Sequence, residues 1–318
     1  MTIAVIGGTG HIGSYLVPRL VQAGYEVVCL SRGARAPYRN PGIWKYVQSI
    51  SVDREREDKA GAFGKHIAGL RADIVIDLIG FTLESVQQIV ESLTGRVRHY
   101  LFCGTIWVHG PSARVPTTEE EPRRPFGDYG IQKAAIEAYL LNQARMLDFP
   151  ATILHPGHIV GAGWAPVNPA GNFNPRVFDI LAKGEPLLLP NLGMESVHHV
   201  HADDVAQSFC RAIDRYSLSV GESFHVVSGQ ALTLRGYAEL TAQWFGKHAE
   251  LSYAPWDEWK KRASAEDAAS TWDHIAHSPN CSIEKARRLL GYQPRYTSLE
   301  AVCESVDWLV EHGVVKTN

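Results

Sequence analysis

A glycine-rich turn close to the beginning of the chain constrains the fold more than any other feature. The apolar stretch 3–6 has the length of a buried strand, and the sequence GGTGHIGS follows it at residues 7–14. Apolar residues then recur at helical spacing as far as Gly24, which is typical of a helix that ends there. Glycines between a strand and a helix predict a βα unit whose helix N-terminus faces phosphate groups.

Further apolar segments repeat the strand pattern along the first half of the chain. They lie at residues 26–30, 46–52, 73–79, 99–104 and 151–154, with helical segments between them. Continuous apolar strands that alternate with helices indicate a parallel sheet covered on both faces. The sequence therefore predicts an α/β fold, a Rossmann-type doubly wound parallel sheet with a smaller C-terminal substrate-binding part.

The alternation breaks after Pro156, and this break suggests where the chain divides. We expect residues 1–156, with returning elements at about 197–228, to form the dinucleotide-binding domain. Residues at about 157–196 and 229–318 are then expected to form the substrate-binding part.

The glycines of the turn have separate expected tasks. One permits the tight turn, one lets the backbone approach a pyrophosphate, and one allows the helix to pack closely on the strand. Together with neighbouring positions they predict a set of cofactor-binding residues: Gly7, Thr9, Gly10, His11, Ile12, Gly13, Ser31, Arg32, Asp53, Lys133 and His155.

The end of the second strand indicates which dinucleotide binds. An acidic residue there would accept a hydrogen bond from the ribose of NAD, but the strand ends in Ser31 and Arg32, which can hold a 2'-phosphate, with Arg35 as a helper. NADP is therefore the predicted cofactor, with NAD as the alternative if Arg32 only stacks on adenine or points to solvent. Asp53 either contacts the adenine amino group or is an exposed loop residue.

Tyr129 and Lys133 are the predicted catalytic pair. They stand four residues apart in DYGIQK at the start of a long helix, so both side chains lie on one face. A phenol has a reference pKa of about 10, and an adjacent ammonium, the positive nicotinamide ring and the helix N-terminus would lower it. Thr105, just past a strand, would hold the reacting oxygen at the carboxyl edge of the sheet. This set predicts proton transfer coupled to hydride exchange at a secondary alcohol.

These motifs resemble the extended branch of the short-chain dehydrogenase/reductases, the NAD-dependent epimerase/dehydratase family. The likeness rests on the glycines, on the Thr105 turn, on Tyr129-x-x-x-Lys133, on HVHADDVAQ at 199–207 and on KARRLLGYQPRYTSLEA at 285–301. It implies an enzyme that reversibly oxidises a carbinol, usually on a sugar. Many members dimerise, so a homodimer is an expectation.

Departures from that family narrow the expected substrate. No arginine precedes the H-V-x-D-D-like stretch to clamp a diphosphate, and Ile106 and Trp107 stand where the dehydratases have Asp-Glu. We therefore expect an oxidoreductase or epimerase for a sugar-like substrate that is not a nucleotide sugar. The alternatives are a nucleotide-sugar epimerase with tightly bound NAD and a non-catalytic dinucleotide-binding protein, regulatory or RNA-associated.

Polar and aromatic residues after the sixth strand predict the substrate side. The loop at 155–175 mixes side chains suited to sugar hydroxyls and to an apolar sugar face, although a loop stabilised by its own turns is an alternative. The predicted substrate-binding residues are Trp107, His158, Trp164, Asn168, Asn172 and His199. No metal is expected, because the histidines at 198, 199 and 201 do not assemble a ligand set of known geometry.

The overall composition limits the classes of partner. A formal net charge of -3 offers no basic surplus for a nucleic-acid backbone, and no apolar stretch reaches the length of a membrane-spanning helix. We expect no nucleic-acid and no membrane partner. The first residues lack the pattern of a secretory signal, so a cytoplasmic location is expected.

Overall fold

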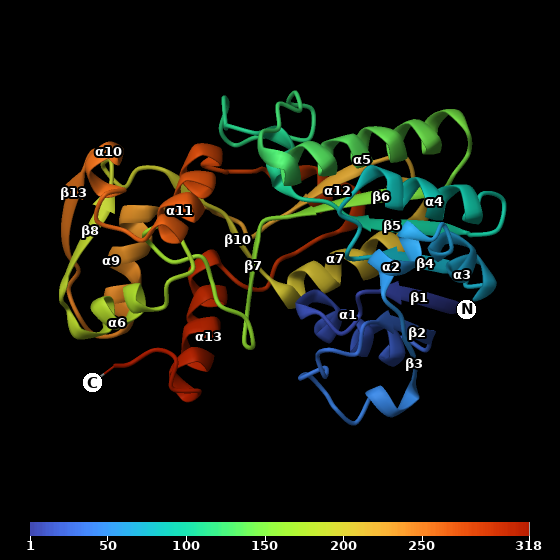
Figure 1. The fold of residues 1–318 in the computed structure, drawn as a ribbon, viewed down its shortest axis with the longest axis horizontal. Helices are drawn as coiled ribbons and strands as arrows, with labels where there is room; N and C mark the ends of the chain where they lie inside the picture. Colours follow the sequence, from blue (N-terminus) through green and yellow to red (C-terminus); the bar gives the residue numbers. More distant parts are fainter. Residues whose placement is uncertain (318) are drawn as a thin grey trace.

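A computed structural model describes residues 1–317 of the chain. Its centre is a parallel sheet with the strand order β11-β6-β5-β4-β1-β2-β3 (Figure 1). The strands of this sheet are β1 (Thr2–Ile6), β2 (Glu26–Ser31), β3 (Val47–Ser51), β4 (Ile74–Asp77), β5 (His99–Cys103), β6 (Ala151–Pro156) and β11 (Ser223–Val226).

Short two-stranded sheets extend from the large sheet toward the C-terminal part. They pair β7 (His158–Val160) with β10 (His199–His201), β8 (Pro186–Pro190) with β13 (Glu250–Ala254), and β9 (Ser196–Val197) with β12 (Leu232–Thr233). In Figure 1 the pair β8 and β13 lies with α6, α9, α10 and α11 at the end of the molecule away from the N-terminus.

Helices cover both faces of the large sheet and build most of the remainder. They are α1 (His11–Gln22), α2 (Arg54–Lys59), α3 (Phe63–Gly69), α4 (Leu83–Leu93), α5 (Gly127–Met146), α6 (Arg176–Lys183), α7 (Ala202–Asp214), α8 (Tyr216–Ser219), α9 (Leu234–Trp244), α10 (Trp256–Trp259), α11 (Ala265–His277), α12 (Glu284–Leu290) and α13 (Ser298–Glu311). Short 3-10 turns are η1 (Trp44–Tyr46) and η2 (Ile106–His109).

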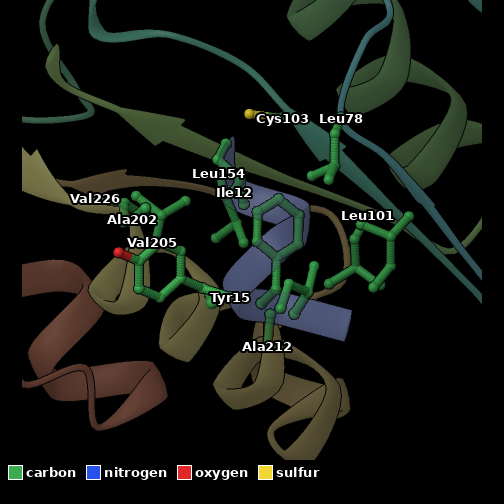
Figure 2. Packing of buried hydrophobic residues seen from close by; sticks show 14 of the residues in the cluster. Ile12, Tyr15, Leu78, Leu101, Cys103, Leu154, Ala202, Val205, Ala212 and Val226 are labelled. Atoms are coloured by element: carbon green, nitrogen blue, oxygen red, sulfur yellow. The ribbon is translucent and has the colours of Figure 1, made fainter. Parts of the chain in front are cut away.

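Two hydrophobic layers hold these helices to the sheet. Along β1, Ile3 and Val5 face one layer while Ala4 and Ile6 face the other, because side chains alternate across a strand. The first layer packs the sheet against α1, α7 and α12, and Figure 2 shows Ile12 of α1 among its buried side chains. The second layer packs the sheet against α3, α4 and α5. The predicted Rossmann-type α/β fold is thereby confirmed.

The strand order places a crevice beside β1. The chain builds outward from β1 in one direction through β2 and β3, and in the other direction from β4 onward. Ligands of such sheets bind outside the carboxyl ends of the strands where the order reverses. Gly7, which follows β1, lies against Ile79, which follows β4. The division of the chain into a dinucleotide-binding and a substrate-binding part stays a prediction.

A buried ion pair fixes the end of β4 beside this crevice. The Arg54 guanidinium donates to both carboxylate oxygens of Asp77, at 2.7 and 3.0 Å, and the Tyr100 hydroxyl donates to the same carboxylate at 2.9 Å. Burial alone would raise the pKa of Asp77, but Arg54 and Tyr100 hold it below its ordinary value. The carboxylate also accepts a hydrogen bond from the Ile79 amide, so the charge fixes the start of the loop after β4.

None of the helices among residues 1–317 combines the length and the apolar character needed to cross a membrane.

Removing Asp77 should destabilise the protein strongly. Asp77→Ala removes the carboxylate that accepts two hydrogen bonds from the buried Arg54 and leaves only Asp58, 3.4 Å from Nε, beside its charge, so we expect the free energy of unfolding to fall by about 3 kcal/mol. Urea denaturation checks this value. The matched control is Lys59→Ala, which breaks the exposed Lys59–Glu55 pair and should lower the stability far less. Equal losses in the two variants would contradict the role of Asp77.

Candidate active site

The glycine turn has the geometry that a dinucleotide pyrophosphate requires. Gly7 adopts a left-handed conformation with φ +84°, and a Cβ on Gly13 would lie 2.1 Å from the Gly8 carbonyl oxygen. Gly10 begins α1 without a capping side chain, and the first turn of α1 contains no acidic residue. The amide groups and the positive end of this helix are therefore available to an anion. The turn fits the phosphates of a dinucleotide.

A cavity of about 640 Å³ lies over this turn. Thr9, Gly10 and His11 line one side, and Arg35 and Trp164 line the other. The Arg35 guanidinium lies 5.4 Å from the centre of the Trp164 ring, which in turn stacks on His11 at 5.1 Å. Thr9, Gly10 and His11 of the predicted glycine turn thus border one space, whereas Gly7, Ile12 and Gly13 do not line it. The side chain of Ile12 belongs to the core.

The residues predicted to select between NADP and NAD do not all line this cavity. Arg35 lines it, whereas Arg32 is an exposed side chain that does not. The Ser31 hydroxyl accepts a hydrogen bond from the Gly33 amide at 3.3 Å. Asp53 caps α2 by accepting from the Arg56 amide at 3.2 Å. Arg35 is therefore the arginine of this turn that borders the predicted cofactor site.

A second cavity of about 410 Å³ adjoins the first, since Trp164 and Phe173 border both. Thr105 and Tyr129 line this second cavity side by side with Trp107 and His158. Thr105 follows β5 and Tyr129 lies in the first turn of α5, so two separate elements bring these hydroxyls to the carboxyl edge of the sheet. This arrangement is the candidate active site.

Helix α11 supplies a further wall of the second cavity. Ser270, Asp273 and His274 follow one another at the spacing of a single helix face, and all three line the cavity. No site residue was predicted in this segment from the sequence. Its alternation of polar and aromatic residues gave no sign of which face turns inward, so these residues were missed.

Lys133 lies behind the cavity wall. Its ammonium donates a hydrogen bond to the Cys103 carbonyl at 2.7 Å, and the side chain is 1% exposed. The rings of Phe102, Phe81 and Tyr129 surround it, with centres 4.6, 5.1 and 5.8 Å from Nζ. Burial lowers the pKa of Lys133 to about 8. Its predicted contact with the cofactor ribose stays a prediction.

The expected acidification of Tyr129 by Lys133 is not found in the protein alone. Tyr129 is 42% exposed where it faces the cavity, yet its partial removal from water raises its pKa to about 12, and Thr105, rather than Lys133, is the group that acts to lower it. The physical reason is that the ammonium is committed to the Cys103 carbonyl in an apolar cage. At neutral pH the phenol is therefore protonated and can donate a hydrogen bond.

His155 does not reach the cofactor cavity, contrary to its prediction. The side chain is fully buried; Nδ1 accepts from the Thr105 amide at 2.9 Å and Nε2 contacts Glu137 at 3.0 Å. Both nitrogens are used inside the protein, so none is left for a ligand.

The predictions for Asn168, Asn172 and His199 are corrected in the same way. The Asn168 and Asn172 side chains are buried and hydrogen-bond each other, and Asn172 also donates to Thr271 of α11 at 3.0 Å. They fix the loop against α11 instead of contacting a substrate. His199 is fully buried and contacts the Val167 carbonyl and the ring of His158. It supports the cavity wall from behind.

Burial keeps the histidines of this region uncharged. It lowers the pKa of His158 well below its ordinary value and that of His199 to about 3. Neither nitrogen of His158 has a hydrogen-bond partner, although both are buried. Within residues 1–317, no group of three or more His, Cys, Asp or Glu side chains is arranged to hold a metal ion.

Comparison with known proteins identifies the family of the chain. The model of a family described as "NAD dependent epimerase/dehydratase family" matches residues 3–226. A chloroplast stem-loop binding protein of 41 kDa (b) from Arabidopsis thaliana is 26% identical over 95% of this chain and 78% of its own length. A UDP-glucose 4-epimerase from Halalkalibacterium halodurans is 25% identical over 98% of this chain and 96% of its own.

The fold is also that of a solved structure. A UDP-glucose 4-epimerase from Thermotoga maritima, with UDP-glucose, superimposes with a TM-score of 0.75. It is 21% identical, and the match covers 98% of this chain and 99% of that one.

A methyl group on Gly10 should weaken dinucleotide binding without unfolding the protein. A Cβ on Gly10 would meet only the Gly7 carbonyl, at 3.2 Å, and would project where the pyrophosphate is expected. For Gly10→Ala we expect at least about a tenfold loss of affinity for NADP and NAD. Isothermal titration calorimetry measures it. The control is Gly42→Ala, whose Cβ would meet nothing within 4 Å and whose affinity should be unchanged.

The buried Lys133 should make stability depend on alkaline pH. Its folded pKa of about 8 lies below the ordinary unfolded value of about 10.4, so between these values the unfolded state binds more protons and stability rises with pH. The wild type should gain about 2 kcal/mol from pH 8 to pH 10 relative to Lys133→Met. Urea denaturation of both proteins at each pH tests this. A constant difference between them would show that Lys133 is not desolvated.

Proposed function

Because the chain belongs to the NAD dependent epimerase/dehydratase family, we propose that it is an NAD(P)-dependent enzyme that oxidises and reduces a secondary alcohol of a sugar-like substrate. The observation that carries this proposal is the shared cavity of Thr105 and Tyr129 next to the glycine turn. Two hydroxyl groups that converge from separate elements on one space can hold a single reacting oxygen between them.

Each residue has a defined task in this proposal. The bound dinucleotide supplies the two-electron acceptor or donor. Thr105 hydrogen-bonds the substrate oxygen and holds it in place. Tyr129, whose phenol is protonated in the protein alone, donates its proton to a carbonyl oxygen during reduction and regains it during oxidation. Lys133 fixes the end of β5 through the Cys103 carbonyl and keeps a positive charge beneath the phenol.

We propose NADP as the cofactor, with NAD as the alternative. The support is chemical: β2 ends in Ser31, the turn after it carries Arg32 and Arg35 and has no acidic residue, and Arg35 lines the cavity over the glycine turn. Arginine suits a 2'-phosphate because its planar guanidinium donates paired hydrogen bonds. The description of the family names NAD and supports the alternative.

Two classes of substrate are candidates for the second cavity: a nucleotide sugar and a sugar without a diphosphate. The comparisons favour a nucleotide sugar, because relatives along the whole chain carry the name UDP-glucose 4-epimerase. The lining favours a sugar without a diphosphate, since the residues that border the second cavity include Asp273 and no arginine or lysine. A dianionic diphosphate next to a carboxylate and without a cation is unfavourable. We propose the sugar without a diphosphate and keep the nucleotide sugar as the second candidate.

A substrate panel with a tyrosine variant tests the proposal. The purified protein is incubated with NADP(H) or NAD(H) and either free sugars and keto-sugars or UDP-glucose and UDP-galactose, and products are identified by NMR. We expect turnover of free sugars. Tyr129→Phe should lower kcat at least about 100-fold and leave NADP affinity unchanged, because only proton transfer is removed.

The outcomes distinguish the candidates. Tyr46→Phe, which removes the hydroxyl of a tyrosine that is 67% exposed, is the matched control and should retain full activity. Conversion of UDP-glucose without net change of the dinucleotide would establish the nucleotide-sugar epimerase instead. Dinucleotide binding without turnover of any substrate would favour the non-catalytic protein, for which the name of the stem-loop binding relative is the supporting observation.

A further inference from the structure

A chain of buried polar groups runs from the Thr105 turn into the interior. The Thr105 amide donates to His155 Nδ1 at 2.9 Å, and His155 Nε2 lies 3.0 Å from Glu137 Oε1. The Glu137 carboxylate accepts two hydrogen bonds from the Arg123 guanidinium, at 2.6 and 2.9 Å. His155 is fully buried and Glu137 is 2% exposed. None of these three side chains lines either cavity, and the function proposed above does not use them.

The geometry determines which nitrogen of His155 carries the proton. A backbone amide can only donate, so Nδ1 must accept and cannot hold a proton. The single proton of the neutral imidazole is therefore on Nε2, where it is donated to Glu137. Burial alone would raise the pKa of Glu137, but His155 and the Arg123 guanidinium hold it well below its ordinary value. A fixed carboxylate thus selects one tautomer of the imidazole.

The fold brings these groups together from three elements of the active site. Glu137 lies four residues after Lys133 and eight after Tyr129, so one face of α5 carries all three side chains. His155 lies in β6, which pairs with β5, the strand that leads into Thr105. A Cβ on Gly104 would be 2.3 Å from His155 Nδ1, so the imidazole packs directly on the backbone of the turn. The network joins the tyrosine helix to the threonine turn behind the cavity.

We propose that His155 and Glu137 are positioning residues that hold the Thr105 turn in register with Tyr129. The inference rests on the proposed function for its catalytic consequence. Glu137 fixes the tautomer, the tautomer supplies the acceptor for the Thr105 amide, and this bond holds the Thr105 backbone in place. The Thr105 hydroxyl accepts from the Trp107 amide at 3.3 Å, so its direction depends on the position of that backbone. Neither residue contacts the substrate.

Two substitutions of His155 separate the two halves of the network. Asparagine places an acceptor oxygen near the position of Nδ1, whereas glutamine places a donor nitrogen near the position of Nε2. His155→Asn should keep the Thr105 amide bonded, and His155→Gln should release it while keeping the contact with Glu137. Hydrogen exchange of the Thr105 amide, measured by NMR on the labelled full chain, should accelerate at least about tenfold in His155→Gln and much less in His155→Asn.

The controls distinguish positioning from general stability. His99 is 1% exposed and hydrogen-bonds Thr152 at the opposite end of β5 and β6, so His99→Gln removes another buried imidazole of the same sheet. It should leave the exchange of the Thr105 amide unchanged. Glu137→Gln is a milder second variant that keeps an acceptor for Nε2 and should accelerate exchange less than His155→Gln. Equal acceleration in His155→Gln, His155→Asn and His99→Gln would overturn the proposal.

A double-mutant cycle tests the catalytic consequence. With the sugar that the panel identifies, His155→Gln should lower kcat about tenfold with KM nearly unchanged, and should lower it less than about twofold when Thr105 is already alanine. Independent losses in the two backgrounds would show that His155 does not act through Thr105. The exchange experiment needs no substrate, so a failure of the proposed function and a failure of the positioning pair give different results.

Discussion

The close approach of the Gly13 backbone to Gly8 is the contact on which the rest of the site depends. Any side chain at Gly13 would collide with the Gly8 carbonyl, so only glycine lets α1 begin directly above the end of β1. This contact brings the amides of the helix to the point where the strand order reverses. The cavity over this turn adjoins the cavity of Thr105 and Tyr129, and Trp164 borders both.

The second half of the site is organised by one face of helix α5. Tyr129 reaches the cavity, Lys133 bonds the end of β5, and Glu137 holds the imidazole that bonds the Thr105 turn. Three successive turns of one helix thus reach the cavity, the end of β5 and the imidazole of His155, which bonds the Thr105 amide. The Lys133 ammonium hydrogen-bonds the Cys103 carbonyl and does not lower the pKa of Tyr129, which is raised to about 12.

Motifs with a local geometric meaning could be recognised from the sequence, whereas polar residues in loops could not be assigned to a role. The glycines of the turn and the Tyr129–Lys133 spacing depend on one turn or one helix, so their placement follows from a few neighbouring residues. Asn168 and Asn172 looked equally suited to a sugar, yet their amides bond each other and α11. An amide group carries no sequence signal that distinguishes a ligand contact from a loop contact, because both use the same hydrogen bonds.

The sequence by itself determined the parallel α/β sheet, the glycine turn between β1 and α1 and the two hydroxyl groups of the candidate chemistry, since each follows from hydrophobic periodicity or from short spacing. Only the tertiary structure decided that α11 supplies a wall of the cavity of Thr105 and Tyr129 and that His155 lies behind Thr105 with both nitrogens occupied. Such contacts join residues that are far apart in the chain. Their geometry arises from the packing of whole elements, and no local pattern encodes it.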